Sequence, residues 1–379
     1  MTDDRACIAV PMPASEGGPY DAVVYLGSDG QDVLRAELEA RFSGRKLVVV
    51  CDPGAARAPE WAATLRAPLV MSEAGEPAKK LSAIEALASQ LVAHGVDRDT
   101  VLVAIGGGAV GDSAGFVAST LLRGIDYVQV PTTLLAMVDS SIGGKTAVNL
   151  PAAKNLLGAF HQPRFVFADL CWMETLPARD RAAGLGEVLK HALLGGEEAL
   201  HAVERDAEAL ATGPIEGLFD VVVQAVTYKA SVVAADPRER GTQRITLNLG
   251  HTVGHALERA SHERGAPLRH GEAVALGLLA EAQLGRALGH WQEGPARLAA
   301  VLPRLGISHA LTSTLASFSD EVMMTALLAD KKRAGGALRF VLLDAPGRPV
   351  IVELDGVVAV EMLRVQNAAD TVKHGGGSR

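Results

Sequence analysis

Four polar side chains recur at helical spacing between residues 244 and 255. They stand at offsets of zero, four, seven and eleven in this stretch and are Arg244, Asn248, His251 and His255. At about 100° per residue they would share one face of a single helix. A hydrophobic core has no use for such a stripe, because each group would need a buried partner. We therefore expect this face to bind a ligand, with a solvated polar face as the alternative.

Two glycines interrupt the same stretch, Gly250 and Gly254. Each costs a helix about 1 kcal/mol relative to alanine. Something must require close approach at these positions, and either a packed neighbour or a bound ligand would explain it.

Three potential metal ligands lie far apart in the sequence, each on a predicted helix or at its start: Glu187, His251 and His270. Two imidazoles and one carboxylate are a common ligand set for catalytic Zn²⁺, which keeps open positions for substrate oxygens. His191, four positions after Glu187, is a second candidate, although it is equally plausible as a helix-surface residue. Spacing alone does not decide between these readings.

A glycine-rich turn, Gly106 to Asp112, follows the apolar run Val101–Ile105 and precedes a predicted helix from residue 113 to 122. Glycines let backbone N–H groups approach a pyrophosphate, and the start of a helix favours negative charge. The turn is neither a clean GxGxxG nor a Walker sequence, so an ordinary tight turn is the alternative. Asp52, after the apolar run 46–51, is where a dinucleotide fold often holds a ribose, but Asp-Pro is also common turn chemistry.

Two lysines lie in a glycine- and serine-rich neighbourhood with few charges. Lys145 ends the run Asp139–Lys145, and Lys154 is followed by Asn155. This pattern suggests a pocket for an anion rather than an arbitrary surface.

The chain has 379 residues and a net charge of −8, with 48% hydrophobic residues. This length allows two domains, and the charge argues against a general nucleic-acid binder. Three widely spaced cysteines form neither a disulfide framework nor a CxxC site. We find no basic, apolar leader and no uninterrupted apolar run long enough to cross a bilayer. A cytoplasmic protein with no membrane partner is expected.

The elements that position these residues fall into two classes. Short apolar runs alternating with helices up to residue 178 predict an α/β domain with a parallel sheet, and from residue 179 the pattern is mainly helical. A hairpin is expected from 338–343 and 350–354 across Pro346-Gly347. We predict an N-terminal dinucleotide-binding domain over 1–178, a helical metal- and substrate-binding domain over 179–367, and a disordered tail over 368–379.

Together, several of these stretches resemble the 3-dehydroquinate synthase family. The matching segments occur in the family's order between about residue 20 and 355 and are Gly106–Asp112, Val130–Asn149, Lys154-Asn155, Gly186–Lys190, Asn248–His255 and His270–Glu272. The resemblance implies a shikimate-pathway lyase that converts 3-deoxy-D-arabino-heptulosonate 7-phosphate to 3-dehydroquinate and phosphate. It also implies NAD, a divalent metal (Zn²⁺ first, Co²⁺ as an alternative), a phosphorylated sugar-acid substrate, and a homodimer.

The resemblance also assigns roles to individual residues. The implied metal ligands are Glu187, His251 and His270. The implied substrate-binding residues are Arg123, Asp139, Lys145, Lys154, Asn155, Lys190, Lys229, Arg244, Asn248 and one of Lys331 and Lys332. The implied NAD-binding residues are Asp52, Glu76, Lys79, Gly107, Gly108, Asp112, Thr132, Thr133, Asp139, Lys154 and Thr175. The implied catalytic residues are His255, Glu239, Lys145 and Lys190.

One departure affects these assignments: the segment 236–244 is one residue longer than the family pattern, which leaves the placement of Glu239 open. Three alternatives stay open. Another sugar phosphate cyclase would share the fold, NAD and metal, although Lys229, Arg244 and Asn248 together favour a substrate that carries a carboxylate. A metal-dependent polyol or glycerol-phosphate dehydrogenase would accumulate NADH, and a non-catalytic binding protein would show no turnover. Ligands drawn from both halves of the chain lead us to expect domain closure.

Overall fold

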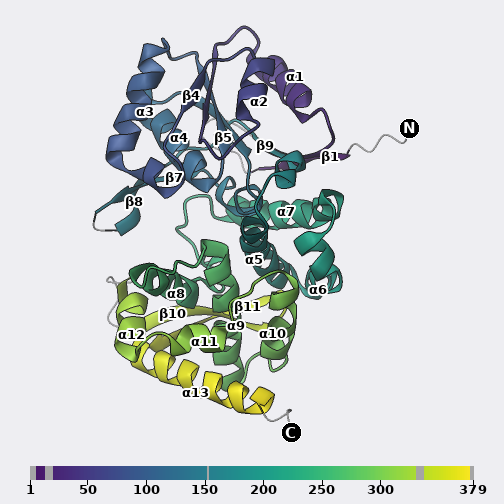
Figure 1. Ribbon diagram of the computed structural model, residues 1–379, viewed down its shortest axis with the longest axis vertical. Helices are drawn as coiled ribbons and strands as arrows, with labels where there is room; N and C mark the ends of the chain where they lie inside the picture. The colour runs from purple at the N-terminus through teal and green to yellow at the C-terminus, as the bar shows by residue number, and fades with distance from the viewer. Residues whose placement is uncertain (1–5, 13–19, 152, 330–336, 376–379) are drawn as a thin grey trace. The chain divides into compact units, whose positions relative to one another are not determined.

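The computed structural model describes residues 6–12, 20–151, 153–329 and 337–375, which form two compact units (Figure 1). The first unit comprises Met1–Leu176 and Pro214–Arg238, and the second comprises Pro177–Gly213 and Glu239–Arg379. The predicted boundary at residue 178 lies close to the first crossing between units. It did not include the return of 214–238 to the first unit. This return occurs because helix α7 (Phe219–Ala235) packs on strands of the first unit.

A seven-stranded sheet forms the centre of the first unit, in the order β1-β2-β9-β6-β5-β3-β4. All neighbouring pairs are parallel except β1, which runs antiparallel to β2. The strands are β1 (Ala6–Pro11), β2 (Asp21–Leu26), β3 (Leu47–Cys51), β4 (Leu69–Met71), β5 (Val101–Gly106), β6 (Asp126–Pro131) and β9 (Val166–Asp169). The predicted α/β class with a parallel sheet is confirmed.

The sheet is buried on both faces, which explains why its central strands read as continuous apolar runs. Every residue of β5 is buried. Figure 1 shows α3 (Leu81–Ala93) and α4 (Gly108–Thr120) on one side of the strands, with α1 (Gly30–Phe42) and α2 (Ala58–Thr64) on the other. These two layers leave the turn between β5 and α4 at the carboxyl ends of the strands, where α/β folds bind ligands.

A separate two-stranded hairpin, β7 (Lys145–Leu150) and β8 (Ala153–Phe160), was not predicted. It carries both lysines of the expected anion pocket, and Lys145 pairs in register with Phe160. The glycine and serine content upstream of Lys145 concealed this strand pair.

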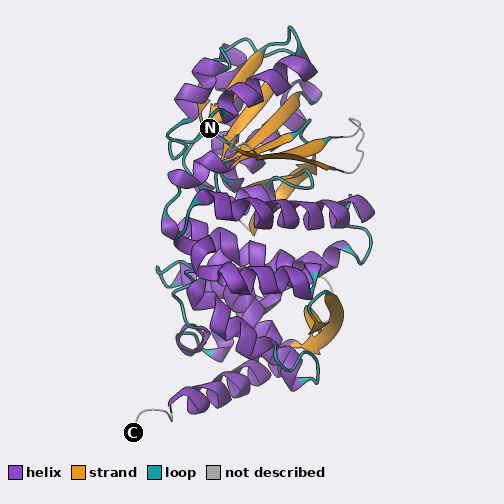
Figure 2. Ribbon diagram, turned by 90° about the vertical axis from the view of Figure 1, so that its right-hand side faces the viewer, coloured by secondary structure: helices purple, strands orange, loops and turns teal. Residues whose placement is uncertain are grey.

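The second unit is mainly helical, with one hairpin (Figure 2). Its central helix is α9 (His270–Ala287), which is buried on all sides, as expected for a helix at the middle of a core. Around it lie α5 (Ala178–Gly195), α6 (Glu197–Thr212), α8 (His251–Glu263), α10 (Gly294–Arg304), α11 (Leu311–Ala316), α12 (Asp320–Ala329) and α13 (Gly356–Gly375). The predicted hairpin is present as β10 (Ala337–Ala345) and β11 (Arg348–Asp355).

One expectation about the end of an element was wrong. The tail expected to be disordered from residue 368 is helical through Gly375, because α13 continues the helix that begins at Gly356. The 3₁₀ turn and helix over Ile215–Ala235 together are long and apolar enough to span a membrane by length and composition, although Glu216, Asp220 and Lys229 interrupt the apolar run. Half of the apolar window is buried inside the protein, however, and core helices meet the same criterion.

Candidate functional site

Close contact between α5 and α9 brings two of the predicted metal ligands together. A Cβ on Gly186 would lie 2.2 Å from the carbonyl oxygen of Gly271, so only glycine allows these backbones to touch. Glu187 follows Gly186, and His270 precedes Gly271. The crossing of the two helices therefore places the carboxylate and the imidazole next to each other.

Helix α8 supplies the third ligand, but the prediction of one continuous helix from Arg244 to His255 was wrong. Residues Arg244–Asn248 form a 3₁₀ helix, η6, and α8 begins only at His251. Gly250 separates them in the left-handed conformation, with φ of 77°. A Cβ on Gly250 would lie 2.7 Å from the side chain of Leu278 on α9, so the expected close approach exists and comes from a packed neighbour.

The three predicted metal ligands meet at one point. One oxygen of Glu187, Oε1, lies 3.6 Å from Nε2 of His251 and 3.4 Å from Nε2 of His270. Ligand atoms each about 2.0–2.1 Å from a tetrahedral Zn²⁺ are separated by about 3.3 Å. The spacing of the donor atoms therefore fits a divalent metal with one carboxylate and two imidazoles.

The far side of each imidazole is held by a hydrogen bond. Nδ1 of His270 lies 3.0 Å from a carboxylate oxygen of Glu258, and Nδ1 of His251 lies 3.1 Å from the carbonyl oxygen of Leu249. A proton donated from Nδ1 leaves the Nε2 lone pair directed at the common point, as in most metal-bound histidines. Glu258 was missed from the sequence, although it stands seven positions after His251 on the same helix face.

The two predicted metal-binding histidines differ in the pKa of their imidazole rings. Burial, with a contribution from the charge of Lys190, lowers the pKa of His251 to about 3, so this ring is neutral at physiological pH. Burial alone would also lower the pKa of His270, but hydrogen bonds with Glu187 and Glu258 outweigh it and raise this pKa to about 10. In the metal-free protein, His270 therefore supplies the positive charge that a metal would bring.

Two further predicted residues adjoin this cluster. Nζ of Lys190 lies 2.6 Å from Oε2 of Glu187. The ring centroid of His255 lies 5.2 Å from that of His251 and 5.6 Å from that of His270. His251, His255 and His270 each offer a nitrogen within 4.8 Å of the others. His191, the other candidate ligand, is buried on α5.

The remaining predicted residues of the second unit lie around η6. Arg244 is buried at 3% exposure, with its Nε 4.0 Å from Oε1 of Glu239. Glu239 lies on a loop at a positive φ of 56°, and Asn248 at the end of η6 is exposed. Lys331 and Lys332 lie outside the described residues.

In the first unit, most of the predicted turn Gly106–Asp112 is helical, because α4 begins at Gly108 and not at residue 113. Gly107 is the N-cap residue, and no described side chain caps this helix end. A Cβ on Gly108 would lie 2.9 Å from the hydroxyl of Ser140, and one on Gly107 would lie 3.2 Å from the side chain of Thr133. The N–H groups at this helix start fit an anion such as a pyrophosphate. Thr132, beside the turn, donates its backbone N–H to the carbonyl of Gly106 at 3.0 Å.

Two predicted cofactor residues, Lys79 and Asp112, form one hydrogen-bonded group with the predicted substrate residue Asn155 beside the turn. Nζ of the buried Lys79 donates to Oδ2 of Asp112 at 2.5 Å and also to the side-chain oxygen of Asn155. Burial raises the pKa of Asp112 despite the opposing charge of Lys79. The group ties α4 to the hairpin β7–β8.

Three other predicted cofactor residues, Asp52, Glu76 and Thr175, already form hydrogen bonds within the protein. Oδ1 of Asp52 accepts N–H bonds from Gly54 at 2.6 Å and Ala55 at 3.1 Å, so one oxygen closes the turn after β3. Glu76 accepts from Asn149 at 2.7 Å. The hydroxyl of the exposed Thr175 donates to the carbonyl of Trp172.

Two predicted substrate-binding residues of the first unit, Lys229 and Asp139, form a partly buried ion pair. Nζ of Lys229 lies 2.8 Å from Oδ1 of Asp139 and donates to the Asp139 carbonyl at 2.5 Å. Lys145 and Lys154 are exposed on the hairpin. Arg123 is also exposed, at the end of a short 3₁₀ helix where its φ is 71°.

Comparison with known sequences gives matches over most of the chain. Residues 69–183 match the family described as 3-dehydroquinate synthase N-terminal, and residues 184–333 match 3-dehydroquinate synthase C-terminal. A 3-dehydroquinate synthase of Symbiobacterium thermophilum is 48% identical over 298 residues, covering 78% of this chain and 82% of the relative. One from Xylella fastidiosa is 42% identical over 326 residues, covering 82% and 81%.

The chain is similar in fold to solved structures of sugar phosphate cyclases. A 2-deoxy-scyllo-inosose synthase complexed with carbaglucose-6-phosphate, NAD⁺ and Co²⁺ has a TM-score of 0.82 at 26% identity, covering 94% of this chain and all of that one (100%). A 2-epi-5-epi-valiolone synthase from Streptomyces hygroscopicus with NAD⁺ and Zn²⁺ has a TM-score of 0.78 at 26% identity, covering 93% and 97%. A probable glycerol dehydrogenase from Sinorhizobium meliloti, at 17% identity and a TM-score of 0.66, shares the fold.

Proposed function

The chain belongs to the 3-dehydroquinate synthase family, and we propose which of its residues carry out that family's reaction. The enzyme converts 3-deoxy-D-arabino-heptulosonate 7-phosphate to 3-dehydroquinate and phosphate. The sequence of steps is a transient oxidation, elimination of phosphate, reduction, and an intramolecular aldol closure. No net oxidation occurs, because the hydride removed in the first step is returned in the third.

The metal site is the part of the proposal with the strongest geometric support. Glu187, His251 and His270 would hold a divalent ion, most simply Zn²⁺, and the observation that carries this assignment is the 3.4–3.6 Å spacing of their donor atoms. When bound, the metal acidifies the substrate hydroxyl that is oxidised, and NAD accepts and then returns the hydride. Glu258 orients His270 for this role.

NAD would bind at the glycine turn of the first unit. Gly107 and Gly108 allow a pyrophosphate to approach the start of α4, and Thr132 and Thr133 adjoin them. The remaining proposed contacts are those assigned by family resemblance, namely Asp52, Glu76, Lys79, Asp112, Asp139, Lys154 and Thr175. Asp52 retains one oxygen for a ribose, because its turn uses only Oδ1.

The cationic and amide side chains would bind the phosphate and the carboxylate of the substrate. In the first unit these are Arg123, Lys145, Lys154, Asn155 and Lys229, together with Asp139. In the second unit they are Lys190, Arg244 and Asn248, and one of Lys331 and Lys332 completes the set. Charged donors bind such groups more strongly than neutral ones. Their role is to hold the substrate in one orientation while its phosphate leaves.

Proton transfer would fall to His255 and Glu239. His255 is partly accessible and lies beside both metal-binding imidazoles, so it could carry a proton to or from the substrate during ring opening and closure. Glu239 would act at the Arg244 side, where its carboxylate lies 4.0 Å from the guanidinium. We also propose a cytoplasmic location and a homodimer, in line with the sequence-based expectation.

A second candidate function is another sugar phosphate cyclization, which the TM-score of 0.82 to a 2-deoxy-scyllo-inosose synthase favours. Both reactions would use NAD and a metal, so the substrate separates them. A substrate that carries a carboxylate requires donors beyond those that bind its phosphate. Lys229 and Arg244 would supply two cations, and Asn248 would supply a neutral amide N–H donor.

The test is phosphate release from heptulosonate 7-phosphate with NAD and zinc, with and without a chelator, while NADH absorbance is followed. We expect chelator-sensitive phosphate release without accumulation of NADH. His251→Ala should abolish release, and His290→Ala, which removes a histidine paired with Asp344, should not. Steady NADH formation would instead indicate a dehydrogenase. If His251→Ala released phosphate at the wild-type rate, the proposed metal site would be wrong.

A further inference from the structure

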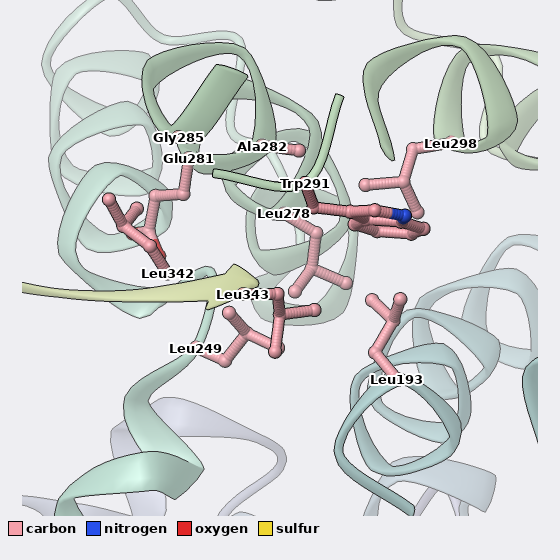
Figure 3. Close-up of a pocket in the computed structure, with 10 residues that line it drawn as sticks. All are labelled: Leu193, Leu249, Leu278, Glu281, Ala282, Gly285, Trp291, Leu298, Leu342 and Leu343. Carbon is pink, nitrogen blue, oxygen red and sulfur yellow. The ribbon is translucent and has the colours of Figure 1, made fainter. Parts of the chain in front are cut away.

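Glu281 is a charged side chain in the apolar core of the second unit. It lies on α9 and is 1% exposed. Figure 3 shows it among the residues that line a small internal cavity, and the other nine are uncharged: Leu193, Leu249, Leu278, Ala282, Gly285, Trp291, Leu298, Leu342 and Leu343. A carboxylate placed there is costly unless hydrogen bonds compensate for its lost hydration.

The cavity has a volume of ≈ 10 Å³, at the lower limit of the space that one water needs, so it offers little room for water to solvate the carboxylate. The compensating hydrogen bonds come from the backbone of the protein instead. Oε2 of Glu281 accepts the N–H of Gly250 at 2.7 Å, and Oε1 accepts the N–H of Val253 at 3.1 Å. Both oxygens therefore bind the first turn of helix α8.

These two bonds replace the cap that α8 cannot make for itself. Gly250 is the N-cap residue and has no side chain that could accept a bond from the helix. In a local capping box, one side chain accepts the N–H at the third helical position and another accepts the N–H of the N-cap residue. Glu281 accepts both from a different helix, and its negative charge also favours the positive end of the α8 dipole.

The capped turn is the one that presents a metal ligand. His251 is the first residue of α8, and its Nδ1 lies 3.1 Å from the carbonyl of Leu249. The backbone of residues 249–253 therefore makes two kinds of contact. The carbonyl of Leu249 lies beside Nδ1 of His251, and the N–H groups of Gly250 and Val253 bind Glu281. If the turn relaxes, both the position of the His251 ring and the carbonyl that orients it change.

We propose that Glu281 is a positioning residue of the metal site, which fixes His251 by capping α8 from α9. This inference rests on the proposed metal-binding role of His251. Glu281 binds the backbone N–H groups of Gly250 and Val253, and it would act on the metal through the position of His251. It explains why an ionisable side chain occupies an otherwise apolar cavity.

The test is the zinc affinity of Glu281→Gln, measured by competition with a chromogenic chelator in the absence of substrate. The amide keeps the shape of the side chain but turns an N–H donor toward one of the two backbone donors. Loss of a residue that orients a metal ligand typically weakens metal binding by about 10- to 100-fold, and we expect an effect at the lower end of this range. The absorption spectrum of the Co²⁺ form should also change, because the geometry around His251 is altered.

Leu342→Ala is the matched control, since Leu342 lines the same cavity and its loss lowers stability without touching the cap. Its zinc affinity and Co²⁺ spectrum should equal those of the wild type. His251→Ala separates the two hypotheses. If this variant binds zinc as the wild type does, the proposed metal site fails. If only His251→Ala loses zinc and Glu281→Gln retains wild-type affinity, the role of Glu281 alone is refuted.

A measurement on the unmodified protein covers the case in which Glu281→Gln does not fold. Amide hydrogen exchange at Gly250 and Val253 should be slow for the first turn of a helix and should slow further when zinc binds. Exchange at these amides that zinc leaves unchanged would contradict a coupling between the cap and the metal site.

Discussion

The ammonium group of Lys190 lies 2.6 Å from the carboxylate of Glu187, and both side chains are almost completely buried, at 1% and 0% exposure. They stand three positions apart on α5, so the helix itself sets their separation. Oε2 of Glu187 faces the lysine, whereas Oε1 faces the two histidines. One carboxylate thus lies between Lys190 on one side and the proposed metal position on the other.

Replacing Lys190 with methionine should destabilise the metal-free protein more than the zinc-bound protein. Removing one partner of a buried ion pair typically costs about 3–5 kcal/mol, because the other charge stays buried. Zinc is a dication that displaces one proton from His270, so it would add one net positive charge beside Oε1. The measurement is the free energy of unfolding in urea, with and without zinc. Arg304→Met, which breaks an exposed pair with Glu208, should change little in either state. An equal loss for Lys190→Met in both states would show that zinc does not compensate.

Gly186→Ala should weaken zinc binding by forcing α5 away from α9. The added Cβ would stand 2.2 Å from the Gly271 carbonyl oxygen, so the helices must separate, and Glu187 and His270 separate with them. We expect zinc affinity to fall by at least about tenfold, as for other changes that displace metal ligands. Gly217→Ala is the control, because its Cβ would meet nothing within 4 Å. Chelator competition measures both variants, and unchanged affinity in Gly186→Ala would contradict this account of how the ligands meet.

Asp169→Asn should remove a pH-dependent loss of stability. Burial raises the pKa of Asp169 to about 6, against an opposing hydrogen bond from the N–H of Cys171. The unfolded carboxyl titrates near its model value of 3.8, so between these values the folded state holds more protons. Stability from this group is therefore greatest at low pH and falls as pH rises to about 6.

The expected size of that effect follows from the shift in pKa. The unfolding free energy of the variant minus that of the wild type should rise by about 2.4 kcal/mol between about pH 4 and pH 8. Using the difference between the two proteins cancels the titration of all other groups. Urea unfolding across this range is the measurement, and a difference that is independent of pH would contradict the raised pKa.

The parts of the site that could be predicted from the sequence are those formed by residues close together along the chain. The strand, glycine turn and helix from Val101 through α4 are contiguous, so their arrangement follows from neighbouring residues. The glycines at 250 and 254 correctly indicated close packing, and α9 is the neighbour. Glu258 could also have been found, because it continues the spacing of His251 and His255 along one helix face.

The parts that sequence did not predict depend on partners distant in the chain. Helical periodicity continues through Gly250, but Glu281 holds the backbone on its far side and the glycine adopts φ of 77°, so the helix restarts there. The return of α7 to the first unit depends on contacts with β1 and β2 that its own apolar pattern does not specify. The meeting of Glu187 with His270 likewise requires two glycines on different helices.

Zinc binding should release close to one proton per ion at about pH 8. At this pH His251 is already neutral, since its pKa is about 3, whereas His270 is protonated, since its pKa is about 10. A metal needs the lone pair on Nε2 of His270, so the proton must leave, and zinc affinity should rise about tenfold per pH unit below the pKa of His270. Calorimetry in buffers of different ionisation enthalpy counts the protons. Glu258→Gln removes one of the groups that raise this pKa, so it should release fewer protons than the wild type. A wild-type heat that does not depend on the buffer would exclude His270 as a ligand that is protonated before zinc binds.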